Sequence, residues 1–291
     1  MNNLFLLIES FRPKQWSKNL IIFAGILFSQ NIADTSMLIL TILAFVIFCL
    51  LSGAVYTIND VADCSEDKSH PIKALRPVPS GRLSIHFALS ASVITVIGAL
   101  IAAYFLNPYF LVASSAYFLL QLSYTFYLKR IVIVDVFAIA FGFVLRVVAG
   151  AIVIDVEISS WLIICTILLS LFLGFCKRRQ ELDSLDSKAK KHRKVLGDYS
   201  QQLIDQMISV VTASTVISYA LYTIAPETVD KFGTKNLIFT VPFVLYGIFR
   251  YLYLVHKKGE GGNPENILVS DIPLIIDIIL WAATAAAILY I

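Results

Sequence analysis

Long apolar segments follow one another along almost the whole chain, and they limit the possible folds more than any other feature. A helix needs about 20 mainly apolar residues to cross the hydrocarbon core of a bilayer. Nine segments have this character, and we expect membrane spans at 16–33, 37–59, 84–105, 109–127, 131–154, 159–176, 204–225, 236–255 and 272–290. They fill nearly all of the 291 residues, of which only 15% are charged, so no soluble domain is expected. We predict an all-α integral membrane protein with a single domain, residues 1–291.

Positive charges alternate between the predicted loops. Nineteen of the 23 Lys and Arg residues fall in the N-terminal segment and in the loops after the second, fourth, sixth and eighth spans. The loops on the other side carry only Lys231 and Lys235. Because cytoplasmic loops are enriched in Lys and Arg, we predict a multi-pass protein of the inner (plasma) membrane, with its N-terminus in the cytoplasm and its C-terminus outside.

The first eleven residues have the pattern of a short surface helix. Their apolar members are Leu4, Phe5, Leu7, Ile8 and Phe11. This spacing predicts a helix lying on the membrane surface. Charged sequence follows with no small-residue cleavage site before it, which indicates an anchor that is retained rather than a cleaved signal.

Two predicted cytoplasmic loops, 60–83 and 177–203, are much longer than the others. They occupy corresponding positions four spans apart, which suggests two four-helix halves followed by a ninth helix. Long loops in compact domains are often functional. Since both lie on the same side of the membrane, we expect them to contribute to one functional face.

The second span runs into an acidic motif containing Asn59, Asp60, Asp63 and Asp67. If the helix continues, Asn59, Asp63 and Asp67 lie at i, i+4 and i+8 on one face, with Asp60 beside them. Carboxylates crowded on one face repel one another unless a cation binds them. Carboxylates together with phosphate oxygens are the usual ligands of Mg²⁺. The motif therefore predicts a Mg²⁺–diphosphate site, although a solvated acidic helix end has the same pattern.

Basic residues follow the acidic motif at once. Lys73 and Arg76 come within twenty residues of Asp60, in a segment that continues through Pro77 to Gly81. Lys and Arg bind phosphate oxygens that a metal leaves free. An acidic motif followed at once by basic residues favours a metal–phosphate site over a solvated acidic helix end.

These residues resemble a known signature. Asn59-Asp60-x-x-Asp63-x-x-x-Asp67, followed by Arg76-Pro77 and Ser80-Gly81, is similar to the first motif of the UbiA superfamily. The resemblance covers essentially the whole chain. It implies nine transmembrane helices around a central cavity open to the cytoplasm, and Mg²⁺ that ionises a diphosphate substrate.

Within the superfamily, the chain most resembles the decaprenyl-phosphate phosphoribosyltransferase branch. The similar segments are Arg12 to Asn19, Tyr124 to Lys129, Asp135, Gly142 to Gly150, Lys177 to Leu182, Arg193 to Tyr199, and Pro264 to Leu274. The aromatic prenyltransferases carry a second aspartate-rich motif after the sixth span. Here that loop opens with Lys177, Arg178 and Arg179. One acidic and one basic loop suit a donor with an additional phosphate, such as phosphoribosyl diphosphate.

Arg146 lies inside the fifth span, about 22 Å along a helix that starts at residue 131. An ionisable residue at such depth usually marks a site. Asp135 precedes it by three helical turns and shares its face. We expect Arg146 to bind the phosphate of the lipid acceptor or a structural carboxylate, and a structural ion pair or a snorkelling side chain remains an alternative. Asp135 has three possible roles: a base, a ligand of metal-bound water, or a structural partner.

The motifs and the resemblance together give one hypothesis for the site and its reaction. Asp60, Asp63 and Asp67 are the predicted catalytic and metal-binding residues. The predicted substrate-binding residues are Lys18, Asn59, Lys73, Arg76, Tyr124, Lys129, Asp135, Arg146, Lys177, Arg178 and Glu181. They would transfer a 5-phosphoribosyl group from phosphoribosyl diphosphate to a polyprenyl phosphate, releasing diphosphate, with Mg²⁺ as cofactor. We expect the membrane as a partner and no nucleic acid, and a homotrimer would fit the resemblance.

Two other functions stay open. An isoprenyl-diphosphate-dependent prenyltransferase shares the fold and the first motif, but it usually has the second acidic motif. A membrane transporter or lipid-binding protein would accommodate Arg146 within the bilayer. The acidic cluster and the two long loops on one side argue against that second class.

Overall fold

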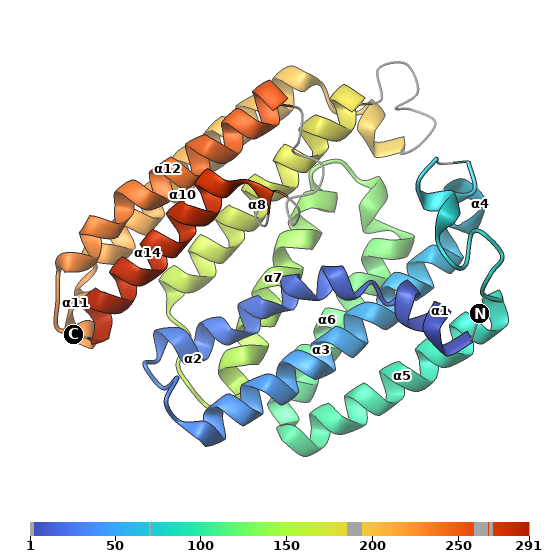
Figure 1. Ribbon diagram of the computed structural model, residues 1–291, viewed down its shortest axis with the longest axis horizontal. Coiled ribbons are helices and arrows are strands. Elements are labelled where there is room, and N and C mark those ends of the chain that lie inside the picture. Colours follow the sequence, from blue (N-terminus) through green and yellow to red (C-terminus); the bar gives the residue numbers. More distant parts are fainter. Residues whose placement is uncertain (1–2, 70, 185–193, 259–266, 268–269, 291) are drawn as a thin grey trace. The chain divides into compact units, whose positions relative to one another are not determined.

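The computed structural model describes residues 3–69, 71–184, 194–258, 267 and 270–290. Over these residues the regular structure is helical, without a strand, which confirms the all-α class. The helices form two compact units, Met1–Ile158 and Ser159–Ile291 (Figure 1). Each unit has its own internal packing.

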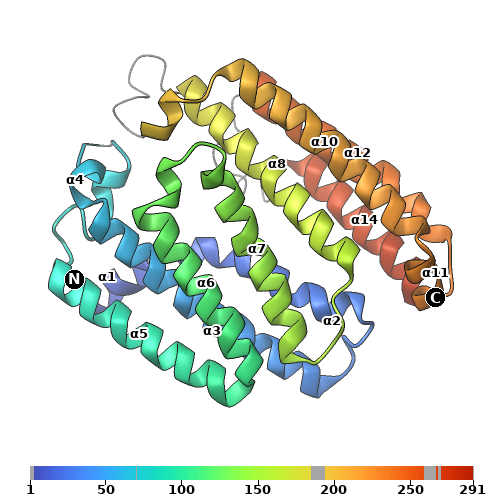
Figure 2. The same ribbon diagram turned by 180° about the vertical axis from the view of Figure 1, so that it is seen from behind.

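The first unit is arranged around α3, a helix of 28 residues. Its elements are α1 (Asn3–Ser10), the 3₁₀ helix η1 (Pro13–Phe23), α2 (Ala24–Phe28), α3 (Thr35–Ala62), α4 (Cys64–Asp67), η2 (Lys73–Leu75), α5 (Ile85–Leu106), α6 (Pro108–Phe126), η3 (Leu128–Arg130) and α7 (Val134–Val153). α3 packs against α5, α6, α7 and η1. α6 and α7 also pack against each other and lie side by side in Figure 2.

Side-chain caps fix where the long helices of this unit begin. The Asp34 carboxylate accepts hydrogen bonds from the first turn of α3, at 2.8 and 3.1 Å. Ser84 accepts one from the first turn of α5 at 3.2 Å. Asn107 accepts two at the start of α6, at 2.7 and 3.2 Å, and Pro108 occupies the first helical position. Asp, Ser and Asn are preferred caps because their oxygens satisfy amide groups that have no partner within the helix.

Aromatic rings and one close backbone approach define the core of the first unit. Phe48 of α3 is fully buried, and its ring centroid lies 5.8 Å from that of Phe110 and 5.1 Å from that of Tyr117. At Gly150 of α7, an added Cβ would lie 2.1 Å from the Ile22 carbonyl oxygen. The absence of a side chain there lets η1 pack directly against α7.

The second unit contains the remaining helices. They are α8 (Ser160–Ser184), η4 (Lys194–Gly197), α10 (Gln201–Ile224), α11 (Pro226–Phe232), η5 (Asn236–Thr240), α12 (Val241–Tyr253), the π-helical η6 (Leu254–Lys258) and α14 (Ile272–Tyr290). α8 packs along α10, and α12 packs against both α10 and α14.

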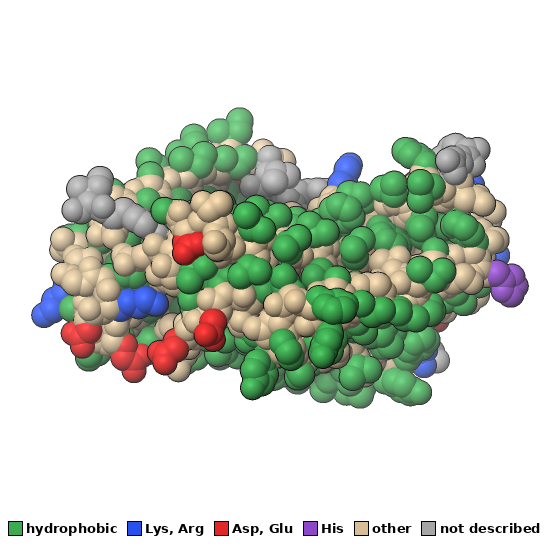
Figure 3. Space-filling view, turned by 90° about the horizontal axis from the view of Figure 1, so that it is seen from below, with side chains coloured by type: hydrophobic (Ala, Val, Ile, Leu, Met, Phe, Trp, Pro, Cys, Tyr) green, Lys and Arg blue, Asp and Glu red, His purple; other side chains and the backbone are tan. Residues whose placement is uncertain are grey.

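Seven of the nine expected spans coincide with helices that are long and apolar enough to cross a membrane, among the residues that the structure describes. Many of their large apolar side chains are exposed, as Ile94 of α5 is at 70%. Figure 3 shows hydrophobic side chains over much of the surface in view, with the acidic side chains gathered toward its left side. Such a surface is suited to lipid rather than to water.

The structure does not confirm the other two spans. The segment expected at 16–33 begins inside the 3₁₀ helix η1 and continues into the five-residue α2. The polar Ser17, Lys18 and Asn19 interrupt its apolar character. The span expected at 109–127 is present as the 19-residue α6, but polar residues such as Ser114 and Gln121 lower its hydropathy. A count of nine spans therefore stays a prediction.

Candidate active site

The three predicted catalytic carboxylates lie at the end of α3 and on α4. Asp60 is completely buried and Asp67 is 3% exposed, while Asp63 is half-buried. The condition that one helix continues through the motif is not met: α3 ends at Ala62, and Asp63 lies between α3 and α4. The helical spacing nevertheless persists: the Asp63 amide donates to the Asn59 carbonyl at 2.9 Å, and the Asp67 amide to the Asp63 carbonyl at 2.8 Å.

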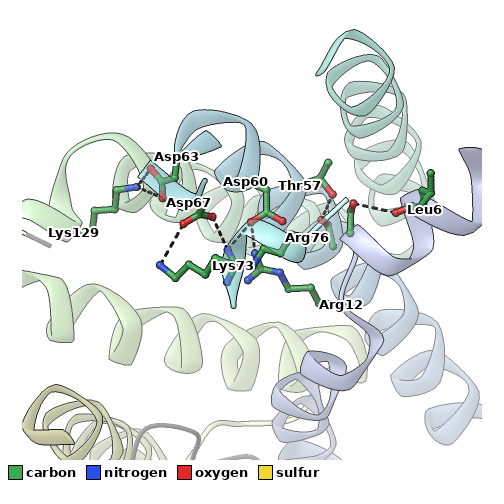
Figure 4. A network of polar contacts seen from close by, with 11 residues as sticks. Leu6, Arg12, Thr57, Asp60, Asp63, Asp67, Lys73, Arg76 and Lys129 are labelled. Carbon is green, nitrogen blue, oxygen red and sulfur yellow. Dashed lines mark hydrogen bonds and ion pairs between the residues drawn. The ribbon is translucent and has the colours of Figure 1, made fainter. Parts of the chain in front are cut away.

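Arg76 joins the two buried carboxylates. Its Nη1 donates to Asp60 Oδ1 at 3.0 Å and to Asp67 Oδ2 at 2.8 Å. Arg12 also donates to Asp60 Oδ1, and Lys73 Nζ lies 3.4 Å from Asp67 Oδ1. Figure 4 shows the guanidinium groups of Arg12 and Arg76 pointing at Asp60. Charge-assisted hydrogen bonds of this kind are about twice as strong as neutral ones, so they hold these side chains together as one network.

The third carboxylate has a separate cation. Lys129 Nζ donates to both oxygens of Asp63, at 2.6 and 2.7 Å. Lys129 belongs to η3, which connects α6 to α7. The fold thus brings Lys129 to the acidic motif (Figure 4). In the sequence, Lys129 is a candidate chiefly through the family resemblance.

Local sequence explains how the cations reach the carboxylates. Arg12 has a left-handed backbone, with φ 52°, at the turn between α1 and η1, and Pro13 then begins η1. Beyond Arg76, the Leu83 amide donates to the Pro77 carbonyl at 2.9 Å, and Gly81 adopts φ 76°. These turns fold the segment after η2 back toward α3.

Burial affects the cations as well as the acids. Burial lowers the pKa of the Arg12 guanidinium, and the neighbouring Asp60 carboxylate acts in the opposite direction. Arg12 also lies over the Tyr56 ring, 5.0 Å from its centroid. An arginine remains charged at neutral pH even when its pKa is lowered, so Arg12 contributes a permanent positive charge beside Asp60.

One carboxylate oxygen has the character of a ligand position. Asp60 Oδ2 is buried and accepts no hydrogen bond from the residues that the structure describes, although a buried carboxylate oxygen normally has a partner. Within the described part of the chain, no three Asp, Glu, His or Cys side chains lie close enough together to form a metal cage. Mg²⁺ characteristically uses one or two carboxylates together with water and phosphate oxygens. The donor set therefore fits a metal that arrives with a phosphorylated substrate.

Arg146 forms a second buried polar centre in the first unit. Its Nε donates to Asn19 Oδ1 at 2.7 Å, Nη1 to the Gly142 carbonyl at 2.9 Å, and Nη2 to Tyr117 Oη at 2.8 Å. Asn19 in turn donates to Ser52 Oγ at 3.1 Å. Each of these acceptors is neutral. The contacts tie η1, α6 and α7 to one another, and the expected acceptor-phosphate role of Arg146 stays a prediction.

Four other predicted residues lie in the first unit. Asn59 is half-buried in the last turn of α3, Lys18 is half-buried on η1, and Tyr124 is half-buried near the end of α6. Asp135 is completely buried in the first turn of α7. Their predicted contacts with substrate stay predictions.

The basic segment after the sixth expected span belongs to the second unit. Arg178 of α8 is 2% exposed and donates to Glu181 Oε2 at 2.6 Å. Arg179 pairs with Asp183 and, at 2.8 Å, with Asp205 of α10. Lys177 is half-buried on α8. The acidic residues Glu181, Asp183 and Asp205 therefore contact arginines. Pro264, Glu265 and most of the basic run 188–194 lie outside the described residues.

Sequence reasoning did not select three residues that the structure places at these centres. Arg12 pairs with Asp60, and Asn19 and Tyr117 hold Arg146. Arg12 and Asn19 begin and end the N-terminal block that resembles the phosphoribosyltransferase branch, which was a usable signal. Nothing in the sequence distinguishes Tyr117 from the many other aromatic residues.

Comparisons with known proteins all indicate the same family. A profile described as the UbiA prenyltransferase family matches residues 19–265, which extend over both units. The chain is 28% identical to the decaprenyl-phosphate phosphoribosyltransferase of Mycolicibacterium smegmatis, over 98% of this chain and 92% of that protein. It is 30% identical to the protein of the same name from Corynebacterium glutamicum, over 98% and 87%.

A solved structure shows that the fold is shared more widely. A UbiA homolog from Archaeoglobus fulgidus bound to GPP and Mg²⁺ has a TM-score of 0.73 with this chain. The match covers 98% of this chain and 100% of that one, at 18% sequence identity. At such low identity the likeness concerns the arrangement of helices.

Proposed function

The chain belongs to the UbiA prenyltransferase family and is a multi-pass membrane transferase, and from this premise we propose that it transfers a 5-phosphoribosyl group from phosphoribosyl diphosphate to a polyprenyl phosphate. Diphosphate is the leaving group, and Mg²⁺ is the cofactor. The relatives at 28% and 30% identity carry the name of a decaprenyl-phosphate phosphoribosyltransferase. Their similarity extends along nearly the whole chain, so the matched region spans the segments of the candidate site as well as the long helices.

The observation that carries the proposal is the composition of the site on α3 and α4. Three carboxylates, Asp60, Asp63 and Asp67, contact four cations, Arg12, Lys73, Arg76 and Lys129. A site of this kind binds a highly charged anion and its metal together. The carboxylates suit the metal, and the cations suit the phosphate oxygens.

The carboxylates would hold Mg²⁺, and Asp60 Oδ2, which has no hydrogen-bond partner within the described part of the chain, would be one of the ligands. A metal held by these carboxylates would neutralise charge on the diphosphate and so make it a better leaving group. The protein's own cations then exchange partners. Arg12 and Arg76 move part of their hydrogen bonding from Asp60 to phosphate oxygens, and Lys129 does the same from Asp63. Charge developing on the leaving group is stabilised by groups already in place.

The transfer itself breaks one bond and forms another. The bond between ribose C1 and the diphosphate oxygen breaks, and its electron pair leaves with diphosphate. An oxygen of the polyprenyl phosphate forms the new bond to C1. A phosphate dianion is already nucleophilic, so the protein does not need to remove a proton. Positioning and electrostatic stabilisation therefore supply most of the acceleration.

The finer topology belongs to the same proposal. Nine spans would surround a cavity open to the cytoplasm and to the inner leaflet, with the N-terminus in the cytoplasm. Phosphoribosyl diphosphate is water-soluble and would enter from the cytoplasm, while the polyprenyl phosphate would enter from the bilayer. The excess of Lys and Arg on one side of the predicted spans supports this orientation.

A turnover assay tests the proposal. The purified chain in lipid vesicles would be given Mg²⁺, a polyprenyl phosphate and phosphoribosyl diphosphate labelled in the ribose, and label in the lipid phase would be counted. We expect lipid-soluble label that requires both the acceptor and Mg²⁺. A parallel reaction would supply an isoprenyl diphosphate and 4-hydroxybenzoate. Product in that reaction alone would overturn the proposal and favour the aromatic prenyltransferase alternative.

A further inference from the structure

The segment that presents Lys73 and Arg76 to the carboxylates has an apolar side as well. Ile72, just before η2, and Leu75, at its end, alternate in sequence with these two cations, and their side chains are 75% and 70% exposed. A short loop that binds phosphate in water has no use for two large exposed aliphatic side chains. Single exposed apolar residues are common on protein surfaces. The exposure of Ile72 and Leu75 is therefore informative only together with the other exposed apolar side chains near them.

A second exposed apolar surface lies on α1. Leu6 and Ser10 form the buried side of this helix. On its other side, Leu4, Phe5 and Ile8 are 59%, 60% and 48% exposed. A helix with one face packed on the protein and an apolar face left exposed is typical of a segment that lies in the membrane interface.

Arg82 connects these two apolar surfaces. Its Nη2 donates to the Leu75 carbonyl at 2.6 Å and to Glu9 Oε1 at 2.9 Å, while Nη1 donates to Glu9 Oε2 at 3.3 Å. Glu9 belongs to α1. The guanidinium group therefore holds the η2 loop against α1, and the two surfaces form one structural piece.

Apolar packing reinforces this connection and extends it to α5. Leu6 of α1 is buried together with Val78, Leu83 and Ala88. Ala88 lies in the first turns of α5, a helix long and apolar enough to span the membrane. α1, the segment after η2 and the start of α5 are thus packed into a single cluster.

The exposed apolar surface continues onto α5. Ile85 and Phe87, in its first turn, are 43% and 39% exposed, and farther along Ile94 and Ile97 are 70% and 54% exposed. Side chains of this kind on a spanning helix face lipid hydrocarbon. Because the α1 and η2 surface joins α5 at the end where that helix begins, lipid is also the partner that would cover it.

We propose that Leu4, Phe5, Ile8, Ile72 and Leu75 form one docking surface for the lipid boundary of the bilayer, so that the loop carrying Lys73 and Arg76 rests on the membrane. The loop then has two faces with different partners: its cations contact Asp60 and Asp67, and its aliphatic side chains contact lipid. This inference concerns the position of the loop and does not depend on the identity of the transferred group.

A depth measurement tests this placement without using activity. A nitroxide label would be attached at Leu75→Cys and, in a second protein, at Ile72→Cys, in vesicles of phosphatidylethanolamine and phosphatidylglycerol. Ser69→Cys supplies a matched control, because Ser69 is an exposed polar residue of the same loop. The chain without substitutions, treated with the same nitroxide reagent, measures the background signal from its own cysteines. Collision rates would be compared for oxygen, which concentrates in lipid, and for a water-soluble nickel chelate.

We expect the ratio of oxygen to nickel collisions to be several-fold higher at positions 72 and 75 than at position 69. Equal ratios at all three positions would overturn the proposal, because the loop would then lie in water. Low collision rates with both reagents at 72 and 75 would overturn it as well, since that result indicates cover by protein, such as a second copy of the chain. Agreement between the two labelled positions guards against disturbance by either substitution.

Discussion

Lys129 donates from one ammonium nitrogen to both carboxylate oxygens of Asp63, at 2.6 and 2.7 Å, across 66 positions of the sequence. The Lys129 side chain is 11% exposed and that of Asp63 is 22% exposed. The pair therefore lies largely out of water, where such contacts are stronger than at a surface. It fixes the connection between α6 and α7 to the acidic motif.

Replacing Lys129 by methionine should lower kcat by roughly 10²–10³-fold, the typical effect of removing one preorganised donor that stabilises developing negative charge. Arg130→Met is the matched control, because Arg130 is the next residue of η3 and is exposed. It should keep activity within a few-fold. Steady-state kinetics in vesicles would measure both variants. Equal activity of the two would show that Lys129 is only a membrane-side anchor.

Asp60→Asn should reduce turnover by at least about 10²-fold, because the metal loses a charged ligand while the side chain keeps its size. The amide still accepts hydrogen bonds from Arg12 and Arg76, so the protein should remain folded. Glu66→Gln is the control, since Glu66 is an exposed acid in the same motif. Undiminished turnover by Asp60→Asn at saturating Mg²⁺ would exclude Asp60 as a metal ligand.

Metal removal gives an independent prediction. Turnover should stop when EDTA removes divalent ions and return when Mg²⁺ is added in excess. Binding of Mn²⁺ in the presence of diphosphate, followed by electron paramagnetic resonance, separates metal binding from chemistry. Asp60→Asn combined with Asp67→Asn should weaken that signal at least tenfold, and Glu66→Gln should leave it unchanged. An unaltered signal in the double variant would place the metal elsewhere.

The sequence predicts those parts of the site whose residues lie close together in the chain. Asp60, Asp63 and Asp67 follow a helical spacing, and Lys73 and Arg76 come soon after, so one segment revealed both halves of the charge pattern. Lys129 needed the family resemblance, because only the fold brings the end of α6 to the end of α3.

Other features depend on contacts that no local pattern reveals. Arg12 reaches Asp60 from a left-handed turn before η1, and backbone geometry of that kind leaves no periodic signal. The expected first span shows the same limit: its apolar content predicts a membrane span at 16–33, and the chain forms the 3₁₀ helix η1 and then α2 there. Asn19 within η1 turns inward to Arg146, and this tertiary contact overrides a uniform helical pattern.

The Arg146 centre should be measurable as an energetic coupling. Arg146 donates to Tyr117 Oη at 2.8 Å and lies 4.5 Å from the centroid of the same ring. In a cycle of Arg146→Met, Tyr117→Phe and the double variant, we expect a coupling of about 0.5–3 kcal/mol in the free energy of unfolding. Unfolding would be followed in detergent by chemical denaturation.

A control cycle would use Tyr104 in place of Tyr117 as the second mutated position. Tyr104 lies on α5 and is 56% exposed. Tyr104→Phe should show no coupling with Arg146→Met. Additive effects in the Tyr117 cycle would mean that the hydrogen bond contributes nothing, and Arg146 would then be better explained by contact with a substrate. Arg146→Lys should not restore stability, because an ammonium group lacks the planar set of donors that reaches Asn19, Gly142 and Tyr117 together.

Gly150 provides a test of the close packing between η1 and α7. Gly150→Ala should destabilise the protein by about 1–3 kcal/mol, the usual cost of overpacking, because its Cβ would lie 2.1 Å from the Ile22 carbonyl oxygen. Gly98→Ala on α5 is the control of opposite sign: no atom of the described residues lies within 4 Å of the added Cβ, and alanine should stabilise this helix by about 0.5–1 kcal/mol. Thermal unfolding in detergent would compare the two variants. If Gly150→Ala unfolded at the native temperature or above it, η1 would not lie against α7 as described, and the route by which η1 brings Asn19 to Arg146 would have to be different.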